Sequence, residues 1–457
     1  MRRLSQRDTL SIITFAIVLI SYLLSRNFFS GDSRWSILTA YSLIEHGTGQ
    51  LDEYRNQIES EPTYAYAIEV HNGHLYSFFP IGPSLVAIPF VMLVDAVLEN
   101  IVPRLEWLEQ PLRSYADHLR RSSPTPDFNV QPLRSIDIYP LVEFLIASII
   151  TALSVALAFP MFSEIIAERY ALFLAFVLAY CTSMWSIVSR SLWQHGPSIL
   201  MLVATMYVLE RAKRQPVWIC AAGLTLAFAY VSRPTNSLTI AVVTLWVVAK
   251  HPKYIPGYLA SALTIAIPFL LYNQITYGNW LPSYYQPQRL GSPDFLQALL
   301  GHLISPGRGL FIFSPVLAFG VLGAVVKVWR KSFHGLDIVW ATVIVLHWLV
   351  ISAFKHWWGG FTFGPRLFSD TLPMWVYFMA PALEQITRAS GIHRKVIMTL
   401  LATAVAISFA IHYQGANNWE TVLWNIEPVN IDAAPNRLWD WKDLQFLRGA
   451  PMALNIP

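Results

Sequence analysis

The chain has 457 residues, of which 54% are hydrophobic and 13% are charged, and its mean hydropathy is +0.44. Soluble domains carry about 25% charged residues, and disordered chains are poor in aromatic residues, so this composition with 17 Trp, 20 Tyr and 26 Phe excludes both classes. The net charge of +4 is small, and the Lys and Arg residues lie in short clusters between apolar runs. We therefore do not expect nucleic-acid binding. We expect an all-α polytopic membrane protein.

The first predicted element is an apolar run over residues 10–25, which follows Arg2 and Arg3. A signal peptide ends in a small-x-small cleavage site, and no such site precedes the polar turn at Arg26. We therefore expect an uncleaved first membrane span. Further apolar runs long enough to cross the hydrocarbon core predict the other spans. They cover about residues 139–160, 170–187, 197–212, 216–231, 235–250, 254–272, 311–328, 336–354, 371–388 and 395–412.

Clusters of Lys and Arg predict the orientation of these spans. They follow every second span, at residues 211–214, 250–253, 327–331 and 388–395. The positive-inside rule places them in the cytoplasm together with the N-terminal arginines. This alternation requires the apolar stretch 81–98 not to cross, and its prolines suit an interfacial helix better than a straight span. The sequence thus predicts about eleven spans, with the N-terminus inside and the C-terminus outside.

The predicted topology places every long connection outside. The membrane domain covers 1–412, with a first extracytoplasmic loop at 26–138 and a second at 273–310, and an extracytoplasmic tail follows at 413–457. No internal repeat is visible, whereas symmetric transporters are usually built of repeated halves. We therefore expect the chemistry on the outer face.

The segment 31–47 at the start of the first loop predicts a short helix on the membrane surface. Gly31 permits a sharp exit from the first span, apolar residues recur at helical spacing, and Gly47 suits the helix stop. Asp32 has two interpretations. It caps the start of the helix, or it is a carboxylate at the lipid–water boundary that accepts a proton from a substrate hydroxyl.

An acid directly after the first span, a surface helix ending in Gly47, and residues 76–83 opening a second interfacial helix resemble the C-type (GT-C) glycosyltransferase superfamily. The nearest branch is that of protein O-mannosyltransferases and bacterial aminoarabinose transferases. The resemblance implies an inverting membrane glycosyltransferase of the bacterial plasma membrane. It would take a sugar from a polyprenyl-phosphate carrier and pass it to a lipid, glycan or protein acceptor. Asp32 matches the family's catalytic acid, although Ser33 stands where the family often has a second acid.

The resemblance also bears on metals. The family commonly has another acid at the outer end of the third span, where metal-dependent members complete a cation site. Here that stretch, 189–197, holds no carboxylate. The resemblance therefore implies a metal-independent reaction without a cofactor, in which Arg190 and His195 position the substrate. The alternative for His195 is an interfacial side chain that bonds to backbone.

Three arginines at outer span ends are candidates for binding the donor phosphate. Arg233, Arg308 and Arg366 are each flanked by Gly or Pro, which predicts tight backbone. A guanidinium can hold a phosphodiester with two hydrogen bonds. The alternative for any single one is contact with lipid headgroups, and we favour Arg308 and Arg366 as the ligands.

The remaining candidates are less specific. Lys355, Trp358 and Tyr285 suit substrate positioning or stacking on a sugar, although an aromatic belt is the general explanation for such rings. The pair His71 and His74 has metal-binding spacing, but it fits a hairpin through Asn72-Gly73 better.

Two other functions stay open at this point. A lipid-carrier glycan ligase of the O-antigen-ligase kind would also work outside, using His and Arg. A non-enzymatic lipid or solute transporter or flippase would form no covalent product. The near-absence of acids and bases within the spans counts against the transporter.

Overall fold

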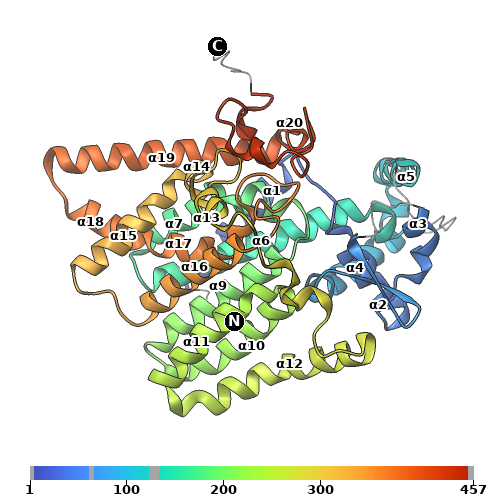
Figure 1. The fold of residues 1–457 in the computed structure, drawn as a ribbon, viewed down its shortest axis with the longest axis horizontal. Coiled ribbons are helices and arrows are strands. Elements are labelled where there is room, and N and C mark those ends of the chain that lie inside the picture. Colours follow the sequence, from blue (N-terminus) through green and yellow to red (C-terminus); the bar gives the residue numbers. More distant parts are fainter. Residues whose placement is uncertain (1–4, 61–65, 123–132, 451–457) are drawn as a thin grey trace.

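The computed structural model describes residues 5–60, 66–122 and 133–450, and these are mostly helical (Figure 1). One antiparallel hairpin is the only sheet in those ranges. The all-α class is therefore confirmed. Within the described ranges, five helices are long and apolar enough to cross a membrane, judged by length and composition. They are Gln6–Leu23, Gly82–Arg104, Ser135–Ser163, Pro252–Tyr277 and Gly391–Asn417.

Helices also occupy the other predicted spans, but several are shorter than a membrane requires. The helices that lie in the predicted spans are α1 (Gln6–Leu23), α6 (Tyr139–Ser163), α7 (Glu168–Tyr180), α9 (His195–Ala212), α10 (Ile219–Ser232), α11 (Ser237–Lys250), α12 (Ile255–Tyr277), α15 (Ala318–Trp329), α16 (Leu336–Ser352), α17 (Leu372–Tyr377), α18 (Met379–Arg388) and α19 (Gly391–Asn417). The run predicted to end at residue 187 stops at Tyr180, because Thr182 accepts a hydrogen bond from the Met184 amide and begins the short helix α8 (Ser183–Ser186).

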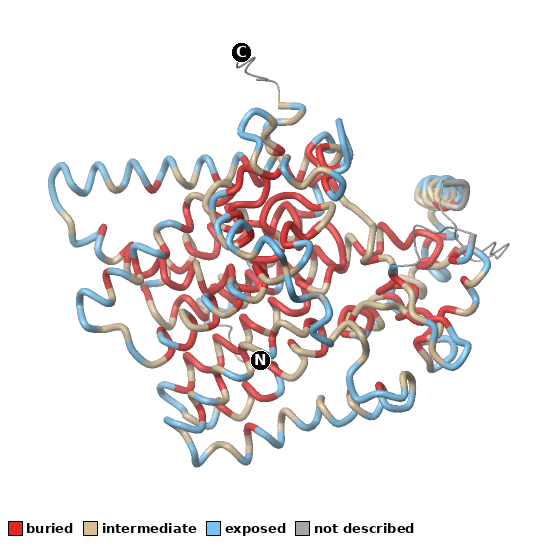
Figure 2. Tube along the Cα trace, viewed as in Figure 1, coloured by how far each residue is buried: buried red, intermediate tan, exposed pale blue. Residues whose placement is uncertain are grey.

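Two long helices present apolar side chains outward. On α12, residues Leu259, Leu263, Ile267 and Leu271 repeat every four positions, and each is about half exposed. Figure 2 shows exposed stretches along α12 and α19, whereas the buried residues gather between the other helices. A continuous apolar stripe of this kind would be unfavourable in water and suits contact with lipid.

The first loop folds into a small helical module beside the ends of the long helices, on the right in Figure 1. It contains α2 (Arg34–His46), α3 (Arg55–Ser60), β1 (Ile68–His71), β2 (His74–Ser77), α4 (Gly82–Asn100) and α5 (Glu106–Ser122). The predicted stop at Gly47 is confirmed, since this residue is left-handed with φ +68°. The predicted hairpin is also confirmed, because Asn72 and Gly73 form the turn and His71 pairs with His74.

The predicted helix after Gly31 is present as α2, and much of it is buried by the rest of the protein. Residues 35–42 are all buried, because α2 packs against α4 and α6. Its apolar side chains Trp35, Ile37 and Leu38 join the core of the loop module. The helix is therefore an internal support of the module.

Ion pairs connect the helix ends at one face of the molecule. Arg7, near the start of α1, lies 3.3 Å from Glu164, which directly follows α6, and 2.8 Å from Glu168, the first residue of α7. Arg214, after α9, reaches the same Glu164 at 2.9 Å. The beginning of α1 and the connections 164–168 and 213–215 therefore lie together at one face.

The opposite helix ends meet around the exit of α1. The Asn27 side chain donates to the Gly415 carbonyl at the end of α19, and Arg190, before α9, donates to the Asn27 carbonyl. The start of α4 at Gly82 and its later part at Asp95 also lie at this second face. Gly82 packs against Ser232 at the end of α10, and Asp95 accepts a hydrogen bond from the Ser135 amide just before α6.

Candidate active site at the exit of the first helix

Asp32 lies in the turn between α1 and α2, and its carboxylate is not used to cap a helix. The N-cap of α2 is Ser33, and neither residue's side chain makes a capping hydrogen bond there. The capping interpretation of Asp32 was therefore wrong. Instead Asp32 is partly exposed and accepts a hydrogen bond of 2.5 Å from the Tyr66 hydroxyl. A carboxylate placed in this way is oriented by a neighbour and still open to a ligand.

Tyr66 is a site residue that sequence reasoning missed. It lies 34 positions from Asp32 and belongs to no recognisable motif, so no sequence signal points to it. Partial burial of the hydroxyl, followed by the charge of Asp32 and its hydrogen bond, raises the pKa of Tyr66 above its usual value. The charges of Arg34 and Arg366 act in the opposite direction and lower that pKa. Tyr66 therefore remains a hydrogen-bond donor to Asp32 at neutral pH.

Two serines and a buried acid fix the backbone on either side of Asp32. The Ser30 hydroxyl donates to Glu143 of α6 at 2.5 Å, and the Ser33 and Ser191 hydroxyls share a hydrogen bond of the same length. Glu143 is 1% exposed. Sequence reasoning noticed this carboxylate only as an acid near a span. The structure makes it the anchor that ties the Asp32 turn to α6.

Arg366 comes to the same region from the other half of the chain. It begins the 3-10 helix η12 (Arg366–Thr371), and its guanidinium lies 4.6 Å above the Trp193 ring. That ring in turn stacks on Phe29, three residues before Asp32, with 6.3 Å between the ring centres. The Trp193 and Phe29 rings thus form a row that links Arg366 to the segment leading into Asp32.

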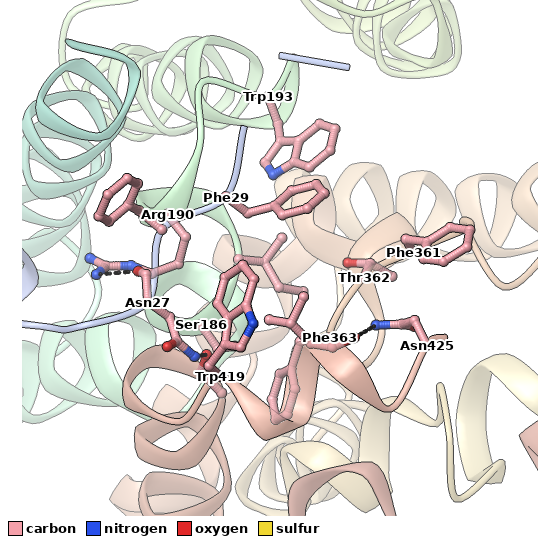
Figure 3. A pocket seen from close by; sticks show the side chains of 14 residues that line it. Asn27, Phe29, Ser186, Arg190, Trp193, Phe361, Thr362, Phe363, Trp419 and Asn425 are labelled. Atoms are coloured by element: carbon pink, nitrogen blue, oxygen red, sulfur yellow. Dashed lines mark hydrogen bonds between the residues drawn. The ribbon is translucent and has the colours of Figure 1, made fainter. Parts of the chain in front are cut away.

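An apolar pocket of about 50 Å³ lies below this row (Figure 3). Its walls come from the exit of α1, the segment 186–193, the loop 361–363 and the tail after α19. The lining residues are Asn27, Phe28, Phe29, Ser186, Ile187, Arg190, Trp193, Phe361, Thr362, Phe363, Gly415, Trp419, Val422 and Asn425. Most are aromatic or aliphatic, so the pocket suits an apolar group next to the Arg366 charge.

Arg190, predicted to position the substrate, forms part of that pocket wall. Its guanidinium donates to the Tyr22 and Asn27 carbonyls and to the Ser189 hydroxyl, and it lies 4.9 Å above the Phe144 ring. Figure 3 shows the bond to Asn27. These acceptors are all neutral, so within the described residues hydrogen bonds and ring contacts hold Arg190 in the pocket wall rather than an ion pair.

Arg308 occupies a different position from the one predicted. It is 1% exposed, and all five of its N–H groups donate to protein oxygens. The acceptors are the carbonyls of Gly307, Trp358 and Gly360 and the side chains of Asn425 and Gln445. Burial, and then repulsion by Arg366, lowers the pKa of this guanidinium to about 9. Arg308 holds loops together and has no hydrogen bond left for a phosphate.

Arg233 and His195 are enclosed in a second buried network. Arg233 Nε lies 3.0 Å from Asp370 Oδ2, His195 Nδ1 lies 3.3 Å from the same oxygen, and Ser198 donates to the other carboxylate oxygen at 2.7 Å. Arg233 also contacts the His195 ring. Neither predicted role, phosphate ligand or substrate positioning, fits side chains that are satisfied in this way. Asp370, which sequence reasoning treated only as a loop end, is the residue that engages both.

The three remaining candidates are dispersed. Lys355 is exposed, and no ion pair to it occurs in the described ranges. Trp358 donates to Asp432 of the tail at 2.7 Å, and Tyr285 donates to the Val231 carbonyl at the same distance. Trp358 and Tyr285 therefore serve packing contacts within the protein.

Histidines and acids do not form a metal cluster among the residues that the structure describes. His71 contacts Glu69 and His74 contacts Asp52, so the two histidines of the hairpin bind different carboxylates. No protein-family model matches this chain, and no curated protein sequence matches it either.

Proposed function

We propose that this protein is a membrane glycosyltransferase that transfers a sugar from a polyprenyl-phosphate carrier to an acceptor hydroxyl on the extracytoplasmic face. The observation that carries the proposal is the Asp32 carboxylate. It lies at the exit of the first helix and accepts a hydrogen bond from the Tyr66 hydroxyl. Arg366 lies above the Trp193 ring, which stacks on Phe29, three residues before Asp32.

In this reaction Asp32 is the general base. It accepts the proton of the acceptor hydroxyl as the oxygen forms a bond to the anomeric carbon of the sugar. The bond from that carbon to the phosphate oxygen breaks, and the electron pair leaves with the polyprenyl phosphate. A single displacement inverts the anomeric configuration. Arg366 stabilises the negative charge on the departing phosphate, and the adjoining aromatic pocket offers apolar surface to the start of the prenyl chain.

The proposal includes a topology of eleven spans with the N-terminus in the cytoplasm. The contacts of Arg7 and Arg214 with Glu164 support it, because they join three predicted cytoplasmic segments. The position of α4 supports it as well. Although α4 is long and apolar enough to cross, its contacts at Gly82 and at Asp95 lie with helix ends of the outer face. By this account α4 lies along the outer leaflet of a bacterial plasma membrane.

The test is transfer of label by the purified protein in nanodiscs, with radiolabelled polyprenyl-phosphate sugars as donors and a membrane extract as the source of acceptors. Wild type is compared with Asp32→Asn, which keeps the shape of the side chain and removes the base. The matched control is Asp294→Asn, since Asp294 is an exposed acid in the second outer loop and makes no capping bond.

We expect labelled product from wild type and from the control, and a loss of about 10²–10⁴-fold in Asp32→Asn. Transfer that survives Asp32→Asn but is lost in Arg366→Met would favour the glycan-ligase alternative. Absence of any product, together with movement of lipid or solute across the bilayer, would favour the transporter.

A further inference from the structure

The tail after α19 contributes one fully buried polar side chain to the region of the candidate site. Gln445 is 0% exposed and uses both ends of its amide. Its oxygen accepts hydrogen bonds from the Gly364 amide at 3.1 Å and from Arg308 at 3.0 Å. Its nitrogen donates to the Thr362 carbonyl at 2.8 Å and to the Thr421 carbonyl at 2.9 Å.

Two of these bonds fall on the loop that leads into Arg366. Thr362 and Gly364 precede Arg366 by four and two residues, and the Arg366 amide donates to the Gly364 carbonyl at 3.0 Å. A direct chain of contacts therefore runs from Gln445 through Gly364 to the backbone of Arg366.

The loop needs such an anchor because of its sequence. Gly359, Gly360 and Gly364 all have positive φ, between +58° and +75°. Glycine has the largest conformational freedom to lose on ordering, so a loop with three of them is held in one conformation only by outside contacts. Gly364 is also fixed by packing, since a Cβ there would lie 2.5 Å from the Phe313 ring.

Other contacts dock the tail itself. Arg308 reaches Asn425 and Gln445 of the tail and the carbonyls of Trp358 and Gly360 in the loop. Asp432 of the tail accepts from the Trp358 indole. Trp419, Val422 and Asn425 complete one wall of the pocket. The tail thus touches the loop at both of its ends and encloses the cavity beneath it.

We propose that Gln445 is a positioning residue for Arg366, and that the tail is a working part of the donor-phosphate site. This inference rests on the proposed function. Gln445 does not touch the donor. It holds the 362–364 backbone so that the Arg366 guanidinium stays above the Trp193 ring.

The first test is a double-mutant cycle with polyprenyl phosphate as the ligand. Gln445→Met keeps the length of the side chain and removes its hydrogen bonds, and Gln288→Met is the matched control at an exposed position. We expect Gln445→Met to weaken binding about tenfold in the wild-type background and less than twofold in the Arg366→Met background. Equal weakening in both backgrounds would overturn the proposal, because a general structural defect does not depend on Arg366.

The second measurement is hydrogen exchange of the peptide that covers residues 361–366, without ligand. Gln445→Met should speed its exchange, and Gln288→Met should not. If Gln445→Met does not fold, Gln445→Glu replaces it, since a carboxylate still accepts from Gly364 but cannot donate to Thr362. Unchanged exchange in the folded variant would overturn the proposal whatever the protein binds.

The two measurements separate this inference from the proposed function. If wild type binds no polyprenyl phosphate, the proposed function fails, and faster exchange in Gln445→Met would then make Gln445 a structural anchor only. If wild type binds the carrier but Gln445→Met leaves both binding and exchange unchanged, the function stands and the positioning role fails.

Discussion

At the scale of single residues, the pair of Asp370 and Arg233 shows how this molecule keeps charges in its interior. Asp370 is 1% exposed, and it contacts His195 and Ser198 of α9 and Arg233 at the end of α10. Breaking a buried ion pair by removing one partner leaves the other charge uncompensated. The pair therefore joins η12, and with it Arg366, to α9 and α10.

We predict that Asp370→Asn lowers the free energy of unfolding by about 3–5 kcal/mol. The control is Glu384→Gln, which removes an exposed partner 3.9 Å from Arg388 and should cost about 0–1 kcal/mol. Thermal unfolding in a mild detergent measures both. Equal midpoints for the two variants would contradict the account of the buried network.

Tyr66 allows a second prediction at this scale. A hydrogen bond to a charged group contributes about 1.5–3 kcal/mol, and this one lies at the surface, so Tyr66→Phe should slow transfer about tenfold with no change in folding. Tyr413→Phe is the control, because Tyr413 is an exposed tyrosine that packs on Trp185 and Phe409. Transfer by the Tyr66→Phe variant at the wild-type rate would show that Asp32 needs no orienting donor.

The arginines show where sequence reasoning stops. Arg233, Arg308 and Arg366 have similar surroundings in sequence, because each has Gly or Pro as an immediate neighbour. The arginines differ in their partners, which lie far along the chain. Arg308 donates a hydrogen bond to Gln445, and Arg233 forms an ion pair with Asp370. Local composition carries no information on those partners. The position of Asp32 directly after the first helix could be predicted, whereas its partner Tyr66 could not.

At the scale of elements, glycines set the distances between several helices. A Cβ at Gly223 of α10 would lie 2.0 Å from the Tyr258 carbonyl of α12, and one at Gly323 of α15 would lie 1.8 Å from the Phe378 carbonyl. Both values are far below van der Waals contact, so these helices pack backbone to backbone. Small residues at such crossings are typical of helix pairs in membranes.

Gly223→Ala should therefore destabilise the protein by about 1–3 kcal/mol, because the two helices must move apart. Gly196→Ala on α9 is the matched control, since its Cβ would meet Ile150 at an ordinary 3.7 Å and a helical alanine is favourable. Thermal unfolding of both variants in detergent measures the difference. A Gly223→Ala midpoint at or above that of Gly196→Ala would contradict the close packing.

Among the elements of the first loop, those with local signals were predicted correctly and those set by tertiary contacts were not. The hairpin through Asn72 and Gly73 and the stop at Gly47 depend on residues that tolerate positive φ, which sequence reveals directly. The burial of α2 depends on α4 and α6, whose packing against it leaves no trace in its own periodicity. For this reason the sequence did not predict the burial of residues 35–42 in α2.

At the scale of the whole molecule, the proposed reaction depends on which side of the membrane each connection between helices occupies. If α4 crossed the membrane, every later connection would exchange sides. Two cysteine variants test this topology, each in a background without Cys181 and Cys220. They are Asn100→Cys, at the exposed end of α4, and Lys253→Cys, before α12. A membrane-impermeant maleimide added to intact cells should label the first variant, and it should label the second only after permeabilisation. The reverse pattern would contradict the eleven-span topology.

The central claim is that Asp32 drives displacement of a polyprenyl phosphate from its sugar. The most direct measurement is release of phosphorus-labelled polyprenyl phosphate from a panel of sugar donors in nanodiscs, because this leaving group reports on every acceptor at once. The account predicts release by wild type in the presence of a membrane extract and a loss of about 10²–10⁴-fold in Asp32→Asn. Release at the same rate by both proteins, or by neither with any donor, would contradict it.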